Sequence, residues 1–354
     1  MPGNGPDPGV SLMTDSLRIA HARPEACAVY RSPVVDTRPR PGHGRTTLPR
    51  SDVRRRASSN GTAAGDTWRV EYCTRPPYAP STSESMPAIT LTTSRLGATD
   101  AHRSLVFLHG IYGRGRNWAP VARTLVQAHP AWQARLVDLR HHGDSPRPPA
   151  PHTIEACARD VVSVLEDAPA PAIVIGHSFG GKVALQAAAL DPSLVSQVWV
   201  IDSTPAAKAP GGSAWQMLDV VGALPADFGT RQQAIDGLVG GGVAPAVAAW
   251  MSANLAFVDG RYRWKIDFDV MRALIADFFR LDLWDVIEAP PPGLAIHVVK
   301  ATESSTLDVH AVERLEAAAA AHHGVYLHHL AGGHWLNTDN PDGLIRLFET
   351  CGIA

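Results

Sequence analysis

Several sequence features are scarce in this 354-residue chain, and the scarcity of each one argues against a particular class of function or partner. No apolar run approaches the ~18 residues that a membrane-spanning helix needs, so we expect no stable membrane insertion. The formal net charge is only −2, which gives no reason to expect nucleic acid as a partner. The few cysteines lack the spacing of a metal site or a disulfide framework, which favours a reducing, intracellular location. They are Cys27, Cys73, Cys157 and Cys351.

Residues 1–87 differ from the rest of the chain. They contain no lysine and little apolar periodicity, but much Pro, Gly, Ser, Thr and Arg. Such a segment cannot bury enough apolar surface to offset the entropy of ordering it. An Arg- and Ser-rich leader is typical of a transit peptide for a chloroplast or mitochondrion, although the acidic residues here argue against one. A disordered extension of a soluble cytoplasmic protein is the alternative, as is a true start near Met86.

From residue 88 to 354, predicted strands and helices alternate. This order predicts an α/β fold with a mostly parallel, doubly wound sheet. Between about residues 205 and 292 the alternation stops and aromatic residues accumulate, which we interpret as a mostly helical cap insertion. The first strands are expected over 89–92, 105–108, 134–138 and 172–175, and the first helices over 121–128, 153–165 and 182–190.

The most informative motif is Gly176-His177-Ser178-Phe179-Gly180, which lies between an apolar strand and an alanine-rich helix. A serine at such a sharp strand-to-helix turn is typical of a nucleophile elbow. Gly176 and Gly180 fit this interpretation, because a Cβ at either position would clash with neighbouring backbone in the strained turn. We therefore expect Ser178 to be a nucleophile.

A serine hydroxyl needs a base to take its proton. The best candidate is His334, on a loop between the last predicted strand and the last predicted helix. Serine attack also needs backbone N–H donors for the oxyanion that it creates. We expect these donors at Phe179 and at Ile111, which follows a strand that ends in His109-Gly110. His109 is expected to support that loop rather than to take part in catalysis.

The acid that orients the histidine is less clearly marked. Asp202 ends a strongly apolar strand at the expected catalytic edge, where a carboxylate is costly without a polar partner. We favour Asp202 for this reason, with Glu303, in a Ser- and Thr-rich turn after a later strand, as the next choice. The remaining candidates are Asp308, Asp267 and Asp269.

As a set, these motifs resemble the serine hydrolases of the α/β-hydrolase superfamily. Within it, the chain resembles a small carboxylesterase/thioesterase-like group of bacteria, mitochondria and plants, and the plant members most. The resemblance implies Ser178 as nucleophile, His334 as base and Ile111 and Phe179 as oxyanion donors. It also supports Asp202, because members of the group usually keep an aspartate there. The matching stretches are 109–113, 136–145, 176–182, 201–205 and 333–335.

The expected activity is hydrolysis of a small acyl ester or thioester through an acyl-enzyme on Ser178. This chemistry requires neither a metal nor an organic cofactor. Two alternatives stay open: a slow-turnover or non-catalytic receptor on the same scaffold, and an acyltransferase. The natural substrate and the oligomeric state are not fixed by the sequence.

Overall fold

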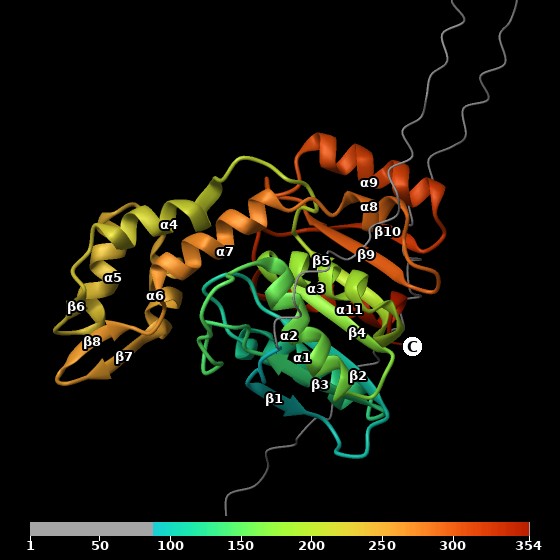
Figure 1. Cartoon of the computed structure of the whole chain (residues 1–354), viewed down its shortest axis with the longest axis horizontal. Coiled ribbons are helices and arrows are strands. Elements are labelled where there is room, and N and C mark those ends of the chain that lie inside the picture. Colours follow the sequence, from blue (N-terminus) through green and yellow to red (C-terminus); the bar gives the residue numbers. More distant parts are fainter. Residues whose placement is uncertain (1–87, 354) are drawn as a thin grey trace, which may run out of the picture. The chain divides into compact units, whose positions relative to one another are not determined.

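The computed structural model describes residues 88–353. The predictions for residues 1–87, including those on Cys27, Cys73 and Met86, fall outside the described residues. A seven-stranded sheet organises the described part, in the order β1-β3-β2-β4-β5-β9-β10, with every neighbouring pair parallel except β1 and β3 (Figure 1). Its strands are β1 (Thr93–Leu96), β2 (Arg103–Leu108), β3 (Trp132–Val137), β4 (Ala172–His177), β5 (Val195–Ile201), β9 (Ala295–Ala301) and β10 (Val325–Leu330).

Helices cover both faces of this sheet because its inner strands are apolar on both sides. Along β2, Val106 belongs to a core cluster with residues of α2 and α3, while Phe107 belongs to a second cluster with residues of α1 and α11. Because successive side chains of a strand point to opposite faces of the sheet, β2 contributes residues to both core clusters. The helices are α1 (Ala119–Ala128), α2 (Ile154–Glu166), α3 (Phe179–Leu190), α8 (Trp284–Glu288), α9 (Val309–Ala321), α10 (Leu336–Asp339) and α11 (Pro341–Cys351), with short 3-10 turns η1 (Gly115–Trp118) and η2 (Pro192–Leu194).

The first edge strand lies later in the chain than predicted. We expected it over 89–92, but β1 begins at Thr93. The reason is that side chains, rather than a neighbouring strand, accept the backbone N–H groups of the predicted segment. The N–H of Ile89 donates to Asp160 Oδ1 at 3.0 Å, and that of Thr92 to Ser145 Oγ at 2.8 Å. Alternating polarity was therefore not sufficient to locate this strand.

Between β5 and α8 the chain forms a group of helices with a small sheet of its own, in the order β6-β8-β7 (Figure 1). We call residues 205–283 the insertion. Lys182 of α3 ties both of its ends to the core, because its buried Nζ donates to Ala206 O at 3.0 Å and to Leu281 O at 2.8 Å. The elements are α4 (Gly212–Gly222), β6 (Asp227–Phe228), α5 (Arg231–Gly240), α6 (Pro245–Met251), η3 (Ser252–Asn254), β7 (Leu255–Val258), β8 (Arg261–Trp264) and α7 (Phe268–Arg280).

Candidate active site

Ser178 lies in the tight turn between β4 and α3, with φ 52° and ψ −117°. A non-glycine residue at positive φ is strained, and such strain persists only where the surroundings enforce it. Here the two flanking glycines permit the turn. A Cβ at Gly176 would lie 2.1 Å from Gly180 O, and one at Gly180 would lie 2.5 Å from His109 O. The sequence therefore folds locally into a turn that holds the Ser178 side chain beyond the end of the strand.

Three polar side chains gather at the carboxyl edge of the sheet. Ser178 follows β4, Asp202 follows β5 and His334 lies in the loop after β10. Asp202 also has positive φ, at 44°, and its N–H donates to Val299 O at 2.8 Å on the neighbouring strand β9. The carboxyl edge of a parallel sheet is where ligands bind in open α/β folds.

His334 and Asp202 are in direct contact. His334 Nδ1 lies 2.6 Å from Asp202 Oδ2, and the carboxylate is fully buried while the imidazole is partly exposed. The second carboxylate oxygen accepts a hydrogen bond from the N–H of Ala301 at 3.1 Å. Burial raises the pKa of Asp202, but hydrogen bonds from His334, Ser304 and the Ala301 N–H outweigh it and hold the pKa below its usual value. Asp202 is thus an ionised acceptor that fixes the Nδ1–H tautomer of His334.

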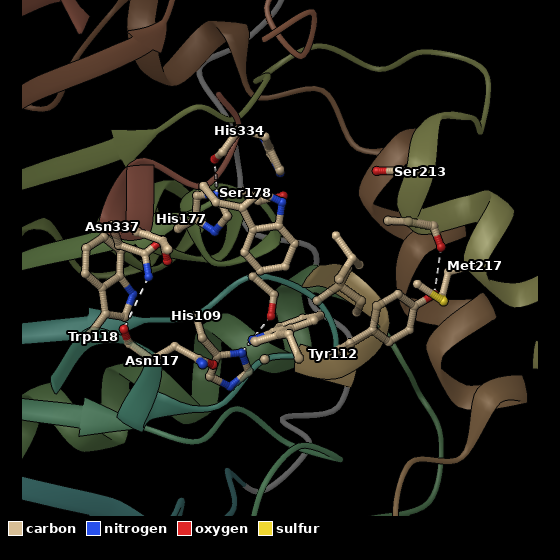
Figure 2. Close-up of a pocket in the computed structure, with 18 residues that line it drawn as sticks. His109, Tyr112, Asn117, Trp118, His177, Ser178, Ser213, Met217, His334 and Asn337 are labelled. Carbon is tan, nitrogen blue, oxygen red and sulfur yellow. Dashed lines mark hydrogen bonds between the residues drawn. The ribbon is translucent and has the colours of Figure 1, made fainter. Parts of the chain in front are cut away.

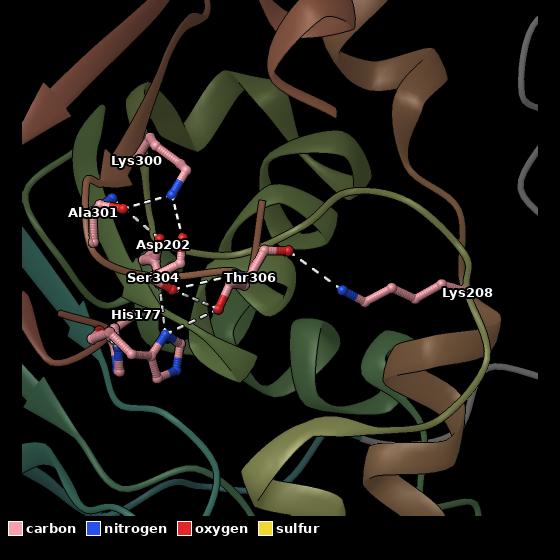
Figure 3. A network of polar contacts seen from close by, with 8 residues as sticks. His177, Asp202, Lys208, Lys300, Ala301, Ser304 and Thr306 are labelled. Carbon is pink, nitrogen blue, oxygen red and sulfur yellow. Dashed lines mark hydrogen bonds and ion pairs between the residues drawn. The ribbon is translucent and has the colours of Figure 1, made fainter. Parts of the chain in front are cut away.

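Sequence reasoning missed two hydroxyls beside this pair. Ser304 hydrogen-bonds the Asp202 carboxylate. Thr306, on the same turn as Ser304 (Figure 3), places its Oγ1 3.2 Å from His334 Nδ1. Ser304 Oγ and Thr306 Oγ1 also contact each other at 3.0 Å. The sequence feature that could have identified them is the Ser- and Thr-rich turn after β9, whose hydroxyls can donate to a nearby carboxylate.

The four alternative acids lie elsewhere. Asp308 caps α9 by accepting the N–H of Ala311 at 2.9 Å. Asp267 caps α7 and is exposed, as is Asp269 in the first turn of the same helix. Glu303 is also exposed, and only its backbone is engaged here, by donation to Gly332 O. Of the five candidates, Asp202 is the one that the structure brings to His334.

Ile111 and Phe179 are placed differently. Ile111 lines the same cavity as Ser178, whereas the Phe179 side chain is buried against Phe278, with ring centroids 6.2 Å apart. The side chain of Phe179, the first residue of α3, thus packs in the core, and only its backbone N–H stays a candidate oxyanion donor. N–H groups in the first turn of a helix lack intrahelical acceptors, so they are available to a ligand.

Two other histidines support the site without charge. His109 Nε2 accepts the N–H of Leu139 at 3.1 Å, so its Nδ1 carries the proton and donates to Gly110 O at 2.8 Å. His177 Nε2 donates to His334 O at 2.7 Å, which ties the elbow to the histidine loop. Burial lowers the pKa of His109 to about 4 and that of His177 to about 3, so both are neutral near pH 7. Gly110 must be small, because a Cβ there would lie 3.0 Å from His177 Nδ1.

Ser178 and His334 line a cavity of about 130 Å³ between the sheet edge and the insertion (Figure 2). Tyr112 closes one side, where its hydroxyl donates to Ala214 O of α4 at 2.7 Å. The remaining walls are largely apolar and aromatic, with a few amide and hydroxyl groups. They comprise Ile111, Trp118, Met217, Val247, Trp250 and Trp335, with Asn117, Ser213, Asn337 and Thr338 as polar members. The walls from α4 and α6 could not be assigned from the sequence, because aromatic residues there were equally compatible with packing.

Neither a metal centre nor a membrane span is found within residues 88–353. No group of three or more His, Cys, Asp or Glu side chains in this part of the chain is arranged to hold a metal ion. None of its helices is long and apolar enough to cross a bilayer.

Comparison with known proteins finds similarity to a hydrolase family and to proteins named as lipases and esterases. The model of the alpha/beta hydrolase family matches residues 105–347. The chain is 28% identical over 250 residues to the sn-1-specific diacylglycerol lipase ABHD11 of Xenopus tropicalis, covering 68% of this chain and 75% of that protein. The Mus musculus protein of the same name is 29% identical over 176 residues, which is 48% of this chain and only about half, 56%, of the mouse protein.

Lipase LipV of Mycobacterium tuberculosis is 30% identical over 222 residues, covering 61% of this chain and 80% of LipV. Among solved structures, a marine microorganism esterase superposes with a TM-score of 0.64 at 22% identity, covering 75% of this chain and 100% of that structure. At this identity the structural likeness concerns the fold alone. The predicted likeness to plant proteins in particular stays a prediction.

Proposed function

Because the chain belongs to the alpha/beta hydrolase family, we propose that it is a serine hydrolase that cleaves carboxylic esters through an acyl-enzyme on Ser178. Relatives named as lipases support ester hydrolysis. The observation that carries the proposal is the 2.6 Å contact between His334 Nδ1 and Asp202 Oδ2, at the edge of a cavity that Ser178 lines.

The chemistry follows from this arrangement. With its Nδ1–H donated to Asp202, His334 has a free lone pair on Nε2 and can take the Ser178 proton as the hydroxyl attacks the ester carbonyl. The N–H groups of Ile111 and Phe179 then donate to the oxyanion, and His334 protonates the departing alcohol. Water attacks the acyl-enzyme by the same steps in reverse. The ionised Asp202 stabilises the imidazolium formed in each half-reaction.

The cavity favours a substrate of modest size. A volume of about 130 Å³ and largely apolar, aromatic walls suit an acyl chain of short to medium length. Oxygen esters and thioesters share the carbonyl that these residues would act on, so both belong to the proposed substrate class. Diacylglycerol, named for the ABHD11 relatives, is a larger candidate, and much of it would lie outside a cavity of about 130 Å³.

Turnover of a simple ester tests this proposal. Purified protein should hydrolyse p-nitrophenyl butyrate over many cycles, and Ser178→Ala should lower kcat by several orders of magnitude while leaving the fold intact. Unchanged activity in Ser178→Ala would contradict the proposal. Stoichiometric binding with one turnover or none would favour a receptor, and product formation only with an added alcohol would favour an acyltransferase.

A further inference from the structure

A second, smaller pocket adjoins the main cavity. Its volume is about 30 Å³, enough for roughly two water molecules or one carboxylate group. Three residues, Tyr112, Asn117 and Trp250, line both spaces, so the pocket lies directly beside the cavity. The pocket is completed by Arg114, Arg116, Ala253 and Asn254.

The two arginines make this pocket cationic. Neither of them forms an ion pair with any residue of the described part of the chain, and Nε of Arg114 is buried there without a hydrogen-bond partner. A buried guanidinium N–H is costly to leave unpaired, and it can only donate. Both arginines act electrostatically on the exposed Asp144, but the carboxylate of Asp144 is held by Lys265 at 2.8 Å. None of the residues that line the pocket is acidic.

The walls of the pocket are fixed by hydrogen bonds that do not use the guanidinium groups. The backbone N–H of Arg114 donates to Asn117 Oδ1 at 2.7 Å, and the N–H of Gly115 donates to Asp138 Oδ1 at 2.7 Å. From the insertion, Asn254 Nδ2 donates to Tyr112 O at 2.8 Å. The loop is thus held in place while the charged side chains stay available.

We propose that Arg114 and Arg116 form an anion subsite of the active site, so that the preferred ester carries a carboxylate or phosphate group apart from its reacting carbonyl. This inference rests on the proposed function. A guanidinium recognises both anions in the same way, through charge-assisted hydrogen bonds to oxygen. The subsite explains why a cationic, unpaired pocket opens beside an otherwise apolar cavity.

Matched substrate pairs test the subsite. In the carboxylate pair, p-nitrophenyl hemiadipate is compared with p-nitrophenyl hexanoate, which has the same chain length without the charge. In the phosphate pair, butyryl glycerol phosphate is compared with butyrylglycerol. Wild-type protein should prefer the anionic member of at least one pair by about tenfold or more in kcat/KM, as expected for one charge-assisted hydrogen bond. Which pair shows the preference identifies the anion.

Variants assign the preference to the two arginines. Arg114→Gln and Arg116→Gln should each reduce it, whereas Arg346→Gln, an equal loss of charge on the exposed face of α11, should preserve it. Added salt should weaken the preference of the wild type. Arg114→Gln should also leave Tm no lower than wild type, since its Nε bonds nothing in the described structure; a merely structural arginine would lower Tm.

Two results overturn the subsite: no preference in either pair, or a preference that both arginine variants retain. These results are distinct from failure of the proposed function. If the wild type cleaves none of the four esters, or Ser178→Ala cleaves them equally well, the proposed function fails and the inference fails with it. If neutral esters are cleaved at Ser178 without a charge preference, only the inference fails.

Discussion

His334 Nδ1 and Asp202 Oδ2 are 2.6 Å apart although 132 positions separate these residues in the sequence. The contact exists because β5 and β10 both end at the carboxyl edge of one parallel sheet, with only β9 between them. Among the described residues His334 Nε2 has no hydrogen-bond partner, and His334 lines the cavity.

Asp202→Asn should preserve the fold but lower kcat by about 10⁴, because an amide can donate to Nδ1 and thereby favour the wrong imidazole tautomer. The effect is measured on p-nitrophenyl butyrate, with circular dichroism to verify folding. Glu303→Gln is the matched control: this side chain is exposed, and activity should change by no more than a few-fold. A larger loss in Glu303→Gln than in Asp202→Asn would assign the acid to the turn after β9 instead.

Gly176→Ala should strongly destabilise the protein, because the new Cβ would lie 2.1 Å from Gly180 O and backbone must move to accommodate it. Gly211→Ala is the control, since a Cβ there meets nothing within 4 Å. Thermal unfolding of both variants measures the difference. Equal Tm values for the two variants would show that the elbow is less crowded than the structure indicates.

Acid should destabilise the fold between about pH 6.5 and pH 3. Burial lowers the pKa of six histidines to about 3 or 4, so the folded state binds fewer protons than the unfolded state in this range. The free energy of unfolding therefore falls as the pH falls through the range, and the histidines contribute no further loss below it. The six are His109, His141, His142, His177, His297 and His328.

Urea unfolding at several pH values measures this dependence. His297→Phe keeps an aromatic ring against Trp199, whose centroid lies 4.0 Å from that of His297, but removes one titrating group. In this variant the free energy of unfolding should change less steeply with pH than in wild type. The difference in slope should correspond to about one proton fewer taken up on unfolding. An identical slope in the variant would contradict a neutral, buried His297.

The sequence predicted the fold because its signals are local. The α/β-hydrolase fold is confirmed, and the strand, turn and helix around Ser178 follow from a short apolar run and two glycines that the turn requires. Prediction was weaker where a side chain distant in the sequence determines the local structure. The edge strand was wrong by several residues because Ser145 and Asp160 accept the N–H groups of the predicted segment.

The candidate site shows the same limit. Ser178 and His334 can be recognised from the residues next to them in the sequence. In contrast, the sequence offered five acids as candidates for the residue that orients the histidine. Only the sheet order places Asp202 opposite His334. The contact of Thr306 with His334 and the position of Arg114 in the small pocket likewise depend on how loops pack together. Composition and periodicity do not reveal this packing.

Covalent labelling of Ser178 tests the central claim most directly. The protein is incubated with a fluorophosphonate, and its intact mass and the labelled peptide are determined by mass spectrometry. We expect rapid addition of one phosphonyl group, located on Ser178, with parallel loss of esterase activity and no labelling of Ser178→Ala. Absence of labelling in a protein that still hydrolyses esters, or a label on another serine whose replacement abolishes activity, would contradict it.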